Sequence, residues 1–392
     1  MNYLEVLTMA GGPGSYVFGA EEKKDLMDVI EAGALFRYGT PGVDGFQGKV
    51  ATFEKEMAEQ LGHKYVVATN AGTSSLMACL AALGIGMGDE VIVPGYTFIA
   101  SISTIIMMNA IPVLAEIDES LTIDPDKIEA LITPRTKAIV PVHMLGNPCK
   151  MDKIMEIAEK YHLTVIEDAA QGIMSSYKGR ALGTIGDFGA FSFHETKNFS
   201  MGEGGALLIR DEKHIEDAEI IREKGTNRSK FFRGQIDKYT WVNFGSSYLP
   251  SEMNVAYVYA QLEIADEITN HRLDCWNRYY ERLKPLADAG KIELPVVPDG
   301  CVHNAHMFYI KAADLAQRSA FIQFMKENEI MCVFHYIPLH TAPAGLKYGR
   351  FHGEDKYTTK ESERLVRLPM FYKLTLEQVD HICDKVIEFF EG

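Results

Sequence analysis

Lys197 is the residue of this sequence whose setting first points to chemistry. It lies between two short apolar runs, Phe188 to Phe193 and Ala206 to Ile209, and each run is typical of a strand. A lysine between buried strands costs desolvation energy unless it has a partner or forms a bond. A Schiff base with a carbonyl compound is one such bond. A lysine in a surface loop is the alternative.

A carboxylate ends the apolar run that precedes this stretch. Residues 163–166 are mostly β-branched, and Glu167 and Asp168 follow them. Ligands of open α/β sheets bind at the carboxyl ends of parallel strands, so Asp168 and Lys197 are expected at one edge. Such a pair suits pyridoxal phosphate, because the lysine bonds to the cofactor and the aspartate keeps its pyridine nitrogen protonated. Taken alone, an acidic pair at a strand end is more often a helix N-cap.

A phosphate cradle is predicted in residues 66–76. The chain there has the pattern of a strand, a turn of small residues that starts at Asn70, and an apolar-periodic helix from Leu76 to Leu83. Backbone N–H groups at the helix start, with the hydroxyl groups of Thr73 and Ser74, would bind a phosphate dianion. An ordinary Ser or Thr N-cap is the alternative.

Three motifs together carry a resemblance to a known family. They are Asp168-x-x-Gln171, Ser192-Phe-His194-x-x-Lys197-Asn198 and Gly202-Glu-Gly-Gly205. With them, the sequence resembles the sugar aminotransferases of the DegT/DnrJ/EryC1/StrS family, which are fold-type I pyridoxal phosphate enzymes, over nearly its whole length. Within that family, the form His194-Glu-Thr-Lys-Asn and later segments such as Asn304-Ala-His-Met-Phe-Tyr are similar to the dTDP-4-amino-4,6-dideoxygalactose transaminases.

The resemblance implies a set of residues that bind pyridoxal 5'-phosphate. Lys197 would be the catalytic lysine that carries it, Asp168 would stabilise its pyridinium nitrogen, and Gln171 would bind its phenolate oxygen. An aromatic residue would stack on the ring, with a place in the core as the alternative. Small residues would hold the phosphate group. The ring contact is assigned to Phe98, and the phosphate contacts to Gly72, Thr73 and Ser192.

Four residues outside that set are expected to bind substrate. His194 would contact the substrate or pack beside the lysine. Lys230 and Arg233, in the basic and aromatic segment from Ser229 to Tyr239, are candidates for a diphosphate, although charge runs are usually solvated faces. Tyr38 lies in a turn that the resemblance places near the substrate mouth, with a packed loop as the alternative.

The resemblance also implies a reaction. L-glutamate would give its amino group to dTDP-4-keto-6-deoxy-D-glucose, which would yield dTDP-4-amino-4,6-dideoxy-D-galactose for a lipopolysaccharide or another surface polysaccharide, in a homodimer with shared active sites. Another keto sugar, such as a keto-octulosonate, is an alternative because Ala34 to Gly39 looks more like other branches of the family. A dehydratase of this fold would carry His in place of Lys197. A non-catalytic regulatory protein that binds pyridoxal phosphate is a further interpretation.

The elements that must position these residues are strands alternating with helices. This alternation predicts an α/β fold with a large, doubly wound and mostly parallel sheet. His143 at a strand end is interpreted as a hydrogen-bonded structural histidine. Further strands are expected at 91–94, 111–116 and 138–143, and helices at 20–32, 49–61, 126–131, 151–161 and 215–224.

The later part of the chain has a different order of elements. A long helix is expected from Glu252 to Leu283, before a smaller α+β layer. The predicted domains are residues 1–265, which bind the cofactor, and residues 266–392. The expected elements of the second domain are strands at 292–295, 307–310 and 331–334, and helices at 316–327 and 376–390.

Length and charge narrow the class of protein. A chain of 392 residues suits a large domain with a smaller one, and a net charge of −15 argues against a nucleic-acid partner. No apolar run could span a bilayer, and Met1 to Val6 lack a signal-peptide pattern, so no membrane partner and a cytoplasmic location are expected. The six cysteines form no CxxC pair, which predicts reduced thiols and no metal site.

Overall fold

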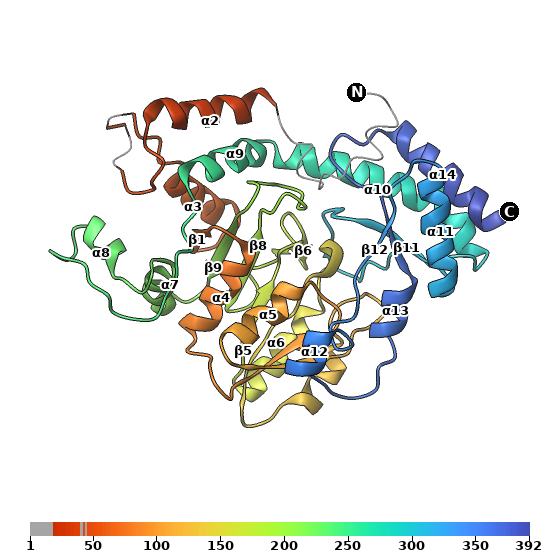
Figure 1. Cartoon of the computed structure of the whole chain (residues 1–392), viewed down its shortest axis with the longest axis horizontal. Helices are drawn as coiled ribbons and strands as arrows, with labels where there is room; N and C mark the ends of the chain where they lie inside the picture. The colour runs from red at the N-terminus through yellow and green to blue at the C-terminus, as the bar shows by residue number, and fades with distance from the viewer. Residues whose placement is uncertain (1–18, 40–41, 44) are drawn as a thin grey trace.

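The computed structural model describes residues 19–39, 42–43 and 45–392, and Figure 1 shows how its elements are arranged. An eight-stranded sheet forms the centre, in the order β1-β9-β8-β5-β4-β2-β3-β13. All pairings from β8 to β13 are parallel, whereas β9 pairs antiparallel with both of its neighbours, so the prediction of a mostly parallel sheet is confirmed. The strands are β1 (Tyr65–Thr69), β2 (Glu90–Pro94), β3 (Ile111–Ala115), β4 (Thr136–Ile139), β5 (Thr164–Asp168), β8 (Phe188–Ser192), β9 (Gly205–Ile209) and β13 (Arg350–Phe351).

Helices cover both faces of this sheet because its strands send alternate side chains into two apolar cores. Ile92 and Val165 belong to the core shared with α3, α6 and α9, whereas their neighbours Val91 and Ile166 belong to the core shared with α4, α5 and α7. A strand that is buried on both faces is mostly apolar along its length, which explains the nearly continuous apolar pattern of these strands. The helices are α3 (Lys49–Gln60), α4 (Gly72–Ala82), α5 (Ile99–Met107), α6 (Met151–Tyr161), α7 (Ile215–Arg222) and α9 (Glu252–Glu263).

The C-terminal part forms a smaller layer on the right of Figure 1. Its antiparallel strands have the order β11-β14-β12, and β11 and β14 share a third apolar core with three helices. The domain boundary at 265 stays a prediction; β13 lies beyond it in sequence and yet pairs with β3 of the large sheet. The elements are α10 (Ala265–Asp288), β11 (Phe308–Lys311), α11 (Leu315–Glu327), β12 (Val333–Phe334), β14 (Leu365–Leu368) and α14 (Leu376–Glu391).

Three predicted elements differ from the observed ones. The long helix from Glu252 is interrupted at Ile264, because α9 packs on α2 (Ala20–Ala32) and α3 whereas α10 packs on α14. The helix predicted at 126–131 is a pair of short 3₁₀ turns, the first capped by Asp124. The strand predicted at 292–295 is reduced to an isolated bridge between Glu293 and Lys311, since Pro295 has no N–H group for a ladder.

Two further expectations concern the cysteines and the absence of membrane-spanning segments. All six cysteines are free, and Cys301 is the most accessible of them. Within the described residues, no helix combines the length and apolar character needed to cross a membrane. The segment Met1 to Val6, on which the expectation about a signal peptide rests, lies outside the described residues.

Candidate active site

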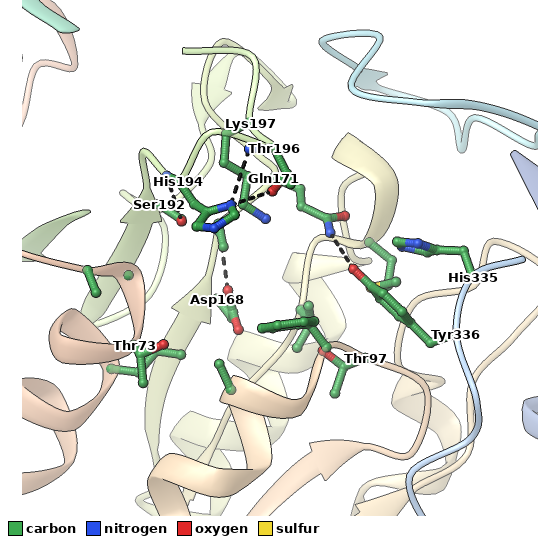
Figure 2. Close-up of a pocket in the computed structure, with 18 of the residues that line it drawn as sticks. Thr73, Thr97, Asp168, Gln171, Ser192, His194, Thr196, Lys197, His335 and Tyr336 are labelled. Carbon is green, nitrogen blue, oxygen red and sulfur yellow. Dashed lines mark hydrogen bonds between the residues drawn. The ribbon is translucent and has the colours of Figure 1, made fainter. Parts of the chain in front are cut away.

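Strand ends of the large sheet bring the predicted cofactor residues into one pocket of about 290 Å³ (Figure 2). Asp168 ends β5 and Ser192 ends β8, and these strands pair in parallel with Asp168 opposite Ala190. Helix α4 starts three residues after β1. Because carboxyl ends of parallel strands meet at one edge, distant segments converge there. The predicted residues that line the pocket are Gly72, Thr73, Phe98, Asp168, Gln171, Ser192, His194 and Lys197.

Lys197 lies in the connection between β8 and β9. Its N–H group donates to the carbonyl oxygen of His194 at 2.9 Å, which closes a turn above the end of β8. Burial lowers the pKa of its amine from 10.5 to about 8; the negative charge of Asp168 acts in the opposite direction, and the positive charge of Arg367 adds to the lowering. The amine is therefore neutral, and able to attack a carbonyl carbon, far more often than that of an exposed lysine.

Asp168 is held in a fixed orientation at the floor of the pocket. It is 4% exposed. The hydroxyl group of Ser101 donates to its Oδ2 at 2.6 Å, and the N–H group of Ala170 donates to its Oδ1 at 3.2 Å. These two donors hold the carboxylate in one orientation, as a partner for a protonated pyridine nitrogen requires.

The start of α4 is built to receive an anion. Its N-cap residue, Ala71, has no side chain that could accept from the first-turn N–H groups. A Cβ added to Gly72 would lie 2.8 Å from the Cβ of Ser192, so glycine is what lets the helix start and the Ser192 hydroxyl approach one another. Thr73 lines the same wall, whereas the Ser74 hydroxyl donates to Asn70 Oδ1 at 2.7 Å and does not line the pocket. This wall fits the phosphate group of pyridoxal phosphate.

Gln171, Phe98 and His194 complete the predicted set. Gln171 accepts from the Leu145 N–H group at 2.6 Å and donates from Nε2 to the Tyr336 hydroxyl at 3.4 Å (Figure 2). Phe98 is 52% exposed, so a pocket position describes it better than a core position. The imidazole of His194 lies 2.9 Å from the hydroxyl group of Thr196.

The other predicted substrate residues lie away from this pocket. Tyr38 hydrogen-bonds to Ser229 at 3.1 Å and stacks on Phe232 at 4.2 Å between ring centroids. Lys230 forms an ion pair with a glutamate of α7, as does Arg233. All of them belong to the projection around α8 (Arg228–Phe232), at the left of Figure 1. Within this chain they do not meet the cofactor residues, and their roles stay predictions.

Several pocket residues were not predicted from the sequence. Burial raises the pKa of the Tyr336 hydroxyl to about 12 and lowers that of His335 well below its usual value. Arg367 stands in the otherwise apolar strand β14, and a charge in such a strand was the signal that could have found it. The unpredicted lining residues that carry polar groups or sulfur are Thr97, Met144, Thr196, Glu203, Met307, His335, Tyr336 and Arg367.

A buried polar network links the lysine loop to the Gln171 loop. The His306 imidazole donates from Nδ1 to Asn198 Oδ1 at 2.8 Å, and Asn198 donates to the Asn304 carbonyl oxygen at 3.1 Å. Asn304 in turn donates to the Gln171 carbonyl oxygen at 2.8 Å. All three side chains are at most 2% exposed. The network therefore fixes the residue next to Lys197 relative to the neighbouring strand end.

His143 is structural, as predicted. It is fully buried, accepts from the Cys149 N–H group at 3.1 Å on Nδ1, and lies 2.9 Å from Glu167 on Nε2. Glu167 itself accepts from three backbone N–H groups of residues 183, 185 and 186. The histidine and the carboxylate thus organise the turn before β8.

Comparisons with known proteins agree with this geometry. The model of the "DegT/DnrJ/EryC1/StrS aminotransferase family" matches residues 20–387. The spore coat polysaccharide biosynthesis protein SpsC of Bacillus subtilis is 33% identical, over 96% of each chain. Among solved structures, DesV of S. venezuelae is 30% identical with a TM-score of 0.84, over 95% of each chain. Spr1654 of Streptococcus pneumoniae, solved in its PMP form, is 25% identical with a TM-score of 0.85, over 98% of each chain.

Proposed function

This chain belongs to the DegT/DnrJ/EryC1/StrS aminotransferase family and is a pyridoxal phosphate-dependent sugar aminotransferase, and we propose that it aminates the 4-keto group of a nucleotide-linked deoxysugar. The proposed acceptor is dTDP-4-keto-6-deoxy-D-glucose, the donor is L-glutamate, and the product is dTDP-4-amino-4,6-dideoxy-D-galactose. The motif from His194 to Asn198 supports this choice of sugar. Because SpsC is a polysaccharide biosynthesis protein, we also propose that the amino sugar is a polysaccharide building block.

The observation that carries the proposal is that the buried Lys197 and Asp168 line one pocket at the carboxyl ends of the strands. Bound pyridoxal phosphate supplies an electron sink that makes the α-proton of the amino donor acidic. Lys197 would carry the cofactor, and once displaced its amine would remove that proton. Asp168 would hold the proton on the ring nitrogen, since Ser101 keeps its carboxylate aimed into the pocket. Gln171 would donate to the phenolate oxygen.

The wall of α4 would anchor the opposite end of the cofactor. Gly72 and Thr73 would offer N–H groups to the phosphate and Ser192 a hydroxyl group, while Phe98 would cover one face of the ring. A cofactor held at its phosphate, ring nitrogen and ring face keeps one orientation through both half-reactions. The same pocket can then receive first the amino acid and then the keto sugar.

We further propose that two copies of this chain form a dimer with shared active sites. The projection around α8 exposes large apolar side chains, with Trp241 at 77% and Phe244 at 56% exposure. Such a patch marks an interaction surface, and a second copy would place Lys230 and Arg233 within reach of the substrate diphosphate. Light scattering of wild type and of Trp241→Ala tests this. Wild type should be a dimer and Trp241→Ala a folded monomer, whereas a wild type that is itself monomeric would contradict the proposal.

The spectrum of the purified, cofactor-loaded enzyme tests the function. Adding L-glutamate should convert the cofactor absorbance of wild type to that of pyridoxamine phosphate and leave Lys197→Ala unconverted, because the variant lacks the proton-transferring amine. A panel of keto sugars then identifies the acceptor: amination of the dTDP-linked sugar is expected, and amination of a keto-octulosonate instead would select the alternative substrate. No shift and no amination in wild type would favour a non-catalytic cofactor-binding protein.

A further inference from the structure

Glu116 is a buried carboxylate that lies outside the pocket wall. It follows directly on β3 and is 4% exposed, and it is not among the side chains that line the pocket. A carboxylate out of water is costly unless hydrogen-bond donors surround it. One donor is the N–H group of the next residue, Ile117, at 2.8 Å. The other donors lie about 240 positions later in the chain.

These donors belong to the start of α13 (Thr358–Arg364). The N–H groups of Lys356, Tyr357 and Thr358 donate to the carboxylate at 2.5, 3.1 and 3.0 Å, and the Thr358 hydroxyl group donates to its Oε1. A helix leaves its first N–H groups without partners, and the N-cap residue Tyr357 has no side-chain bond to offer them. A negative charge at this end also complements the helix dipole. Glu116 therefore caps a helix that is distant in sequence.

Helix α13 in turn holds the part of the pocket wall that contains Tyr336. Ser362, in the last turn of the helix, is 2% exposed and donates its hydroxyl group to the carbonyl oxygen of Tyr336. The helix continues directly into β14, which pairs with β12, and β12 ends one residue before His335. A displacement of α13 would therefore move His335 and Tyr336 with it.

The large sheet holds the same wall at a second strand end. The hydroxyl group of Tyr96 donates to the carbonyl oxygen of His335, and the Leu339 N–H group donates to the Gly95 carbonyl oxygen at 3.0 Å. Tyr96 and Gly95 follow β2, which pairs in parallel with β3. Two neighbouring strand ends thus fix this wall, β2 by direct contact and β3 through Glu116 and α13.

We propose that Glu116 is a positioning residue for substrate binding, which acts through α13 on Tyr336. This rests on the proposed function, and it assigns a role in the reaction to a side chain that touches neither cofactor nor substrate. Tyr336 and His335 lie across the pocket from Thr73, where the phosphate group is proposed to bind (Figure 2). Loss of the cap should therefore weaken the binding of substrates and leave the anchoring of the cofactor intact.

The experiment compares Glu116→Ala and Glu116→Gln with the control Glu119→Gln, all as cofactor-loaded enzymes. Glu119 is three positions away, is exposed, and loses the same charge. Spectral titrations give the Kd for the cofactor and the apparent Kd for L-glutamate, and amination gives KM for the keto sugar. Hydrogen–deuterium exchange follows residues 333–340, which include the wall, and residues 356–364, which include α13. The exchange measurement needs no turnover.

A second set of variants tests the route from the carboxylate to the pocket. Ser362→Ala and the double variant with Glu116→Ala complete a double-mutant cycle. If both side chains act through α13, Ser362→Ala should weaken substrate binding in wild type and add little in the Glu116→Ala background. Additive effects of the two substitutions would overturn this route.

Glu116→Ala should raise KM for the keto sugar and the apparent Kd for L-glutamate by about tenfold, because a shifted wall no longer fits the bound substrates. The Kd for the cofactor should stay within about twofold, and exchange should become faster in both segments. Glu116→Gln should lie between Glu116→Ala and wild type, since it loses the charge but keeps an acceptor oxygen. All values for Glu119→Gln should stay within about twofold of wild type.

Three results would overturn the proposal. They are unchanged substrate binding in a folded Glu116→Ala, faster exchange confined to 356–364, and a loss of cofactor affinity as large as that of substrate affinity. If Glu116→Ala does not fold, Glu116→Gln decides by the same measurements. If wild type aminates no keto sugar and exchange at 333–340 still becomes faster in Glu116→Ala, the positioning of the wall stands and the proposed function fails.

Discussion

The pKa of Lys197 should respond in opposite directions to two substitutions in its surroundings. Burial brings the pKa from 10.5 to about 8, so at pH 7 the neutral amine is about 300 times more abundant than at an ordinary lysine. Asp168 raises this pKa and Arg367 lowers it. In the cofactor-free protein, Asp168→Asn should therefore move the pKa further below 8, and Arg367→Met should move it above 8.

Competitive acetylation at a series of pH values, read by mass spectrometry, measures this pKa directly. Lys160 serves as the internal reference, because its ion pair with Glu129 raises its pKa above 10.5. Lys197 should reach half of its maximal reactivity near pH 8, well before the reference. A half-point above pH 10 in wild type, or shifts of the same sign in the two variants, would refute the account of burial and charge given for this site.

Three further substitutions test the elements around the lysine. Lys197→Met should stabilise the cofactor-free protein by up to about 3 kcal/mol below pH 8, because the folded-state pKa lies below the unfolded one. This gain should fade between pH 8 and about 10.5, and urea unfolding that shows a loss at pH 7 would contradict it. Gly72→Ala should weaken cofactor binding about tenfold, because the added Cβ would lie 2.8 Å from the Cβ of Ser192. Gly86→Ala is the control, since its added Cβ would lie 3.9 Å from the nearest atom. Equal cofactor affinities of the two variants in a titration would count against the phosphate cradle. Asn198→Ala should lower the free energy of unfolding by about 1–3 kcal/mol, because His306 loses its buried acceptor; no change in urea unfolding would mean that the network contributes nothing to stability.

The cofactor half of the site was predictable from local patterns. Strand ends are visible as apolar runs that stop at polar residues, and the topology of a parallel sheet brings those ends together without further information. Asp168 and Lys197 could therefore be placed at one edge before the fold was known, whereas Ser192 was assigned through the family resemblance. The role of Ser74 could not, since the choice of its hydroxyl group between Asn70 and the pocket depends on side-chain orientation within the turn.

The residues around β12 and β14 were beyond local reasoning. Arg367 is separated from Lys197 by 170 positions in sequence, and its place in the pocket depends on how the small sheet packs on the large one. For Tyr38 and Arg233 the difficulty is of another kind. A pattern can suggest that a residue contacts substrate, but it does not say whether that substrate lies in the same chain or in a second copy.

One half of the pocket comes from the large sheet and the other from the small layer, and the two halves suit different roles. The residues that suit the cofactor come from the strand ends and helix starts of the large sheet, and their orientation is fixed by buried partners such as Ser101 for Asp168. Arg367, Tyr336 and His335 come from the small layer, where the guanidinium has no carboxylate partner among the described residues. Substitutions in the large sheet should then act mainly on cofactor affinity, and those in the small layer on the binding of substrates. A chain with a net charge of −15 repels anions at long range, so the binding of an anionic substrate must come from short, charge-assisted contacts inside the pocket.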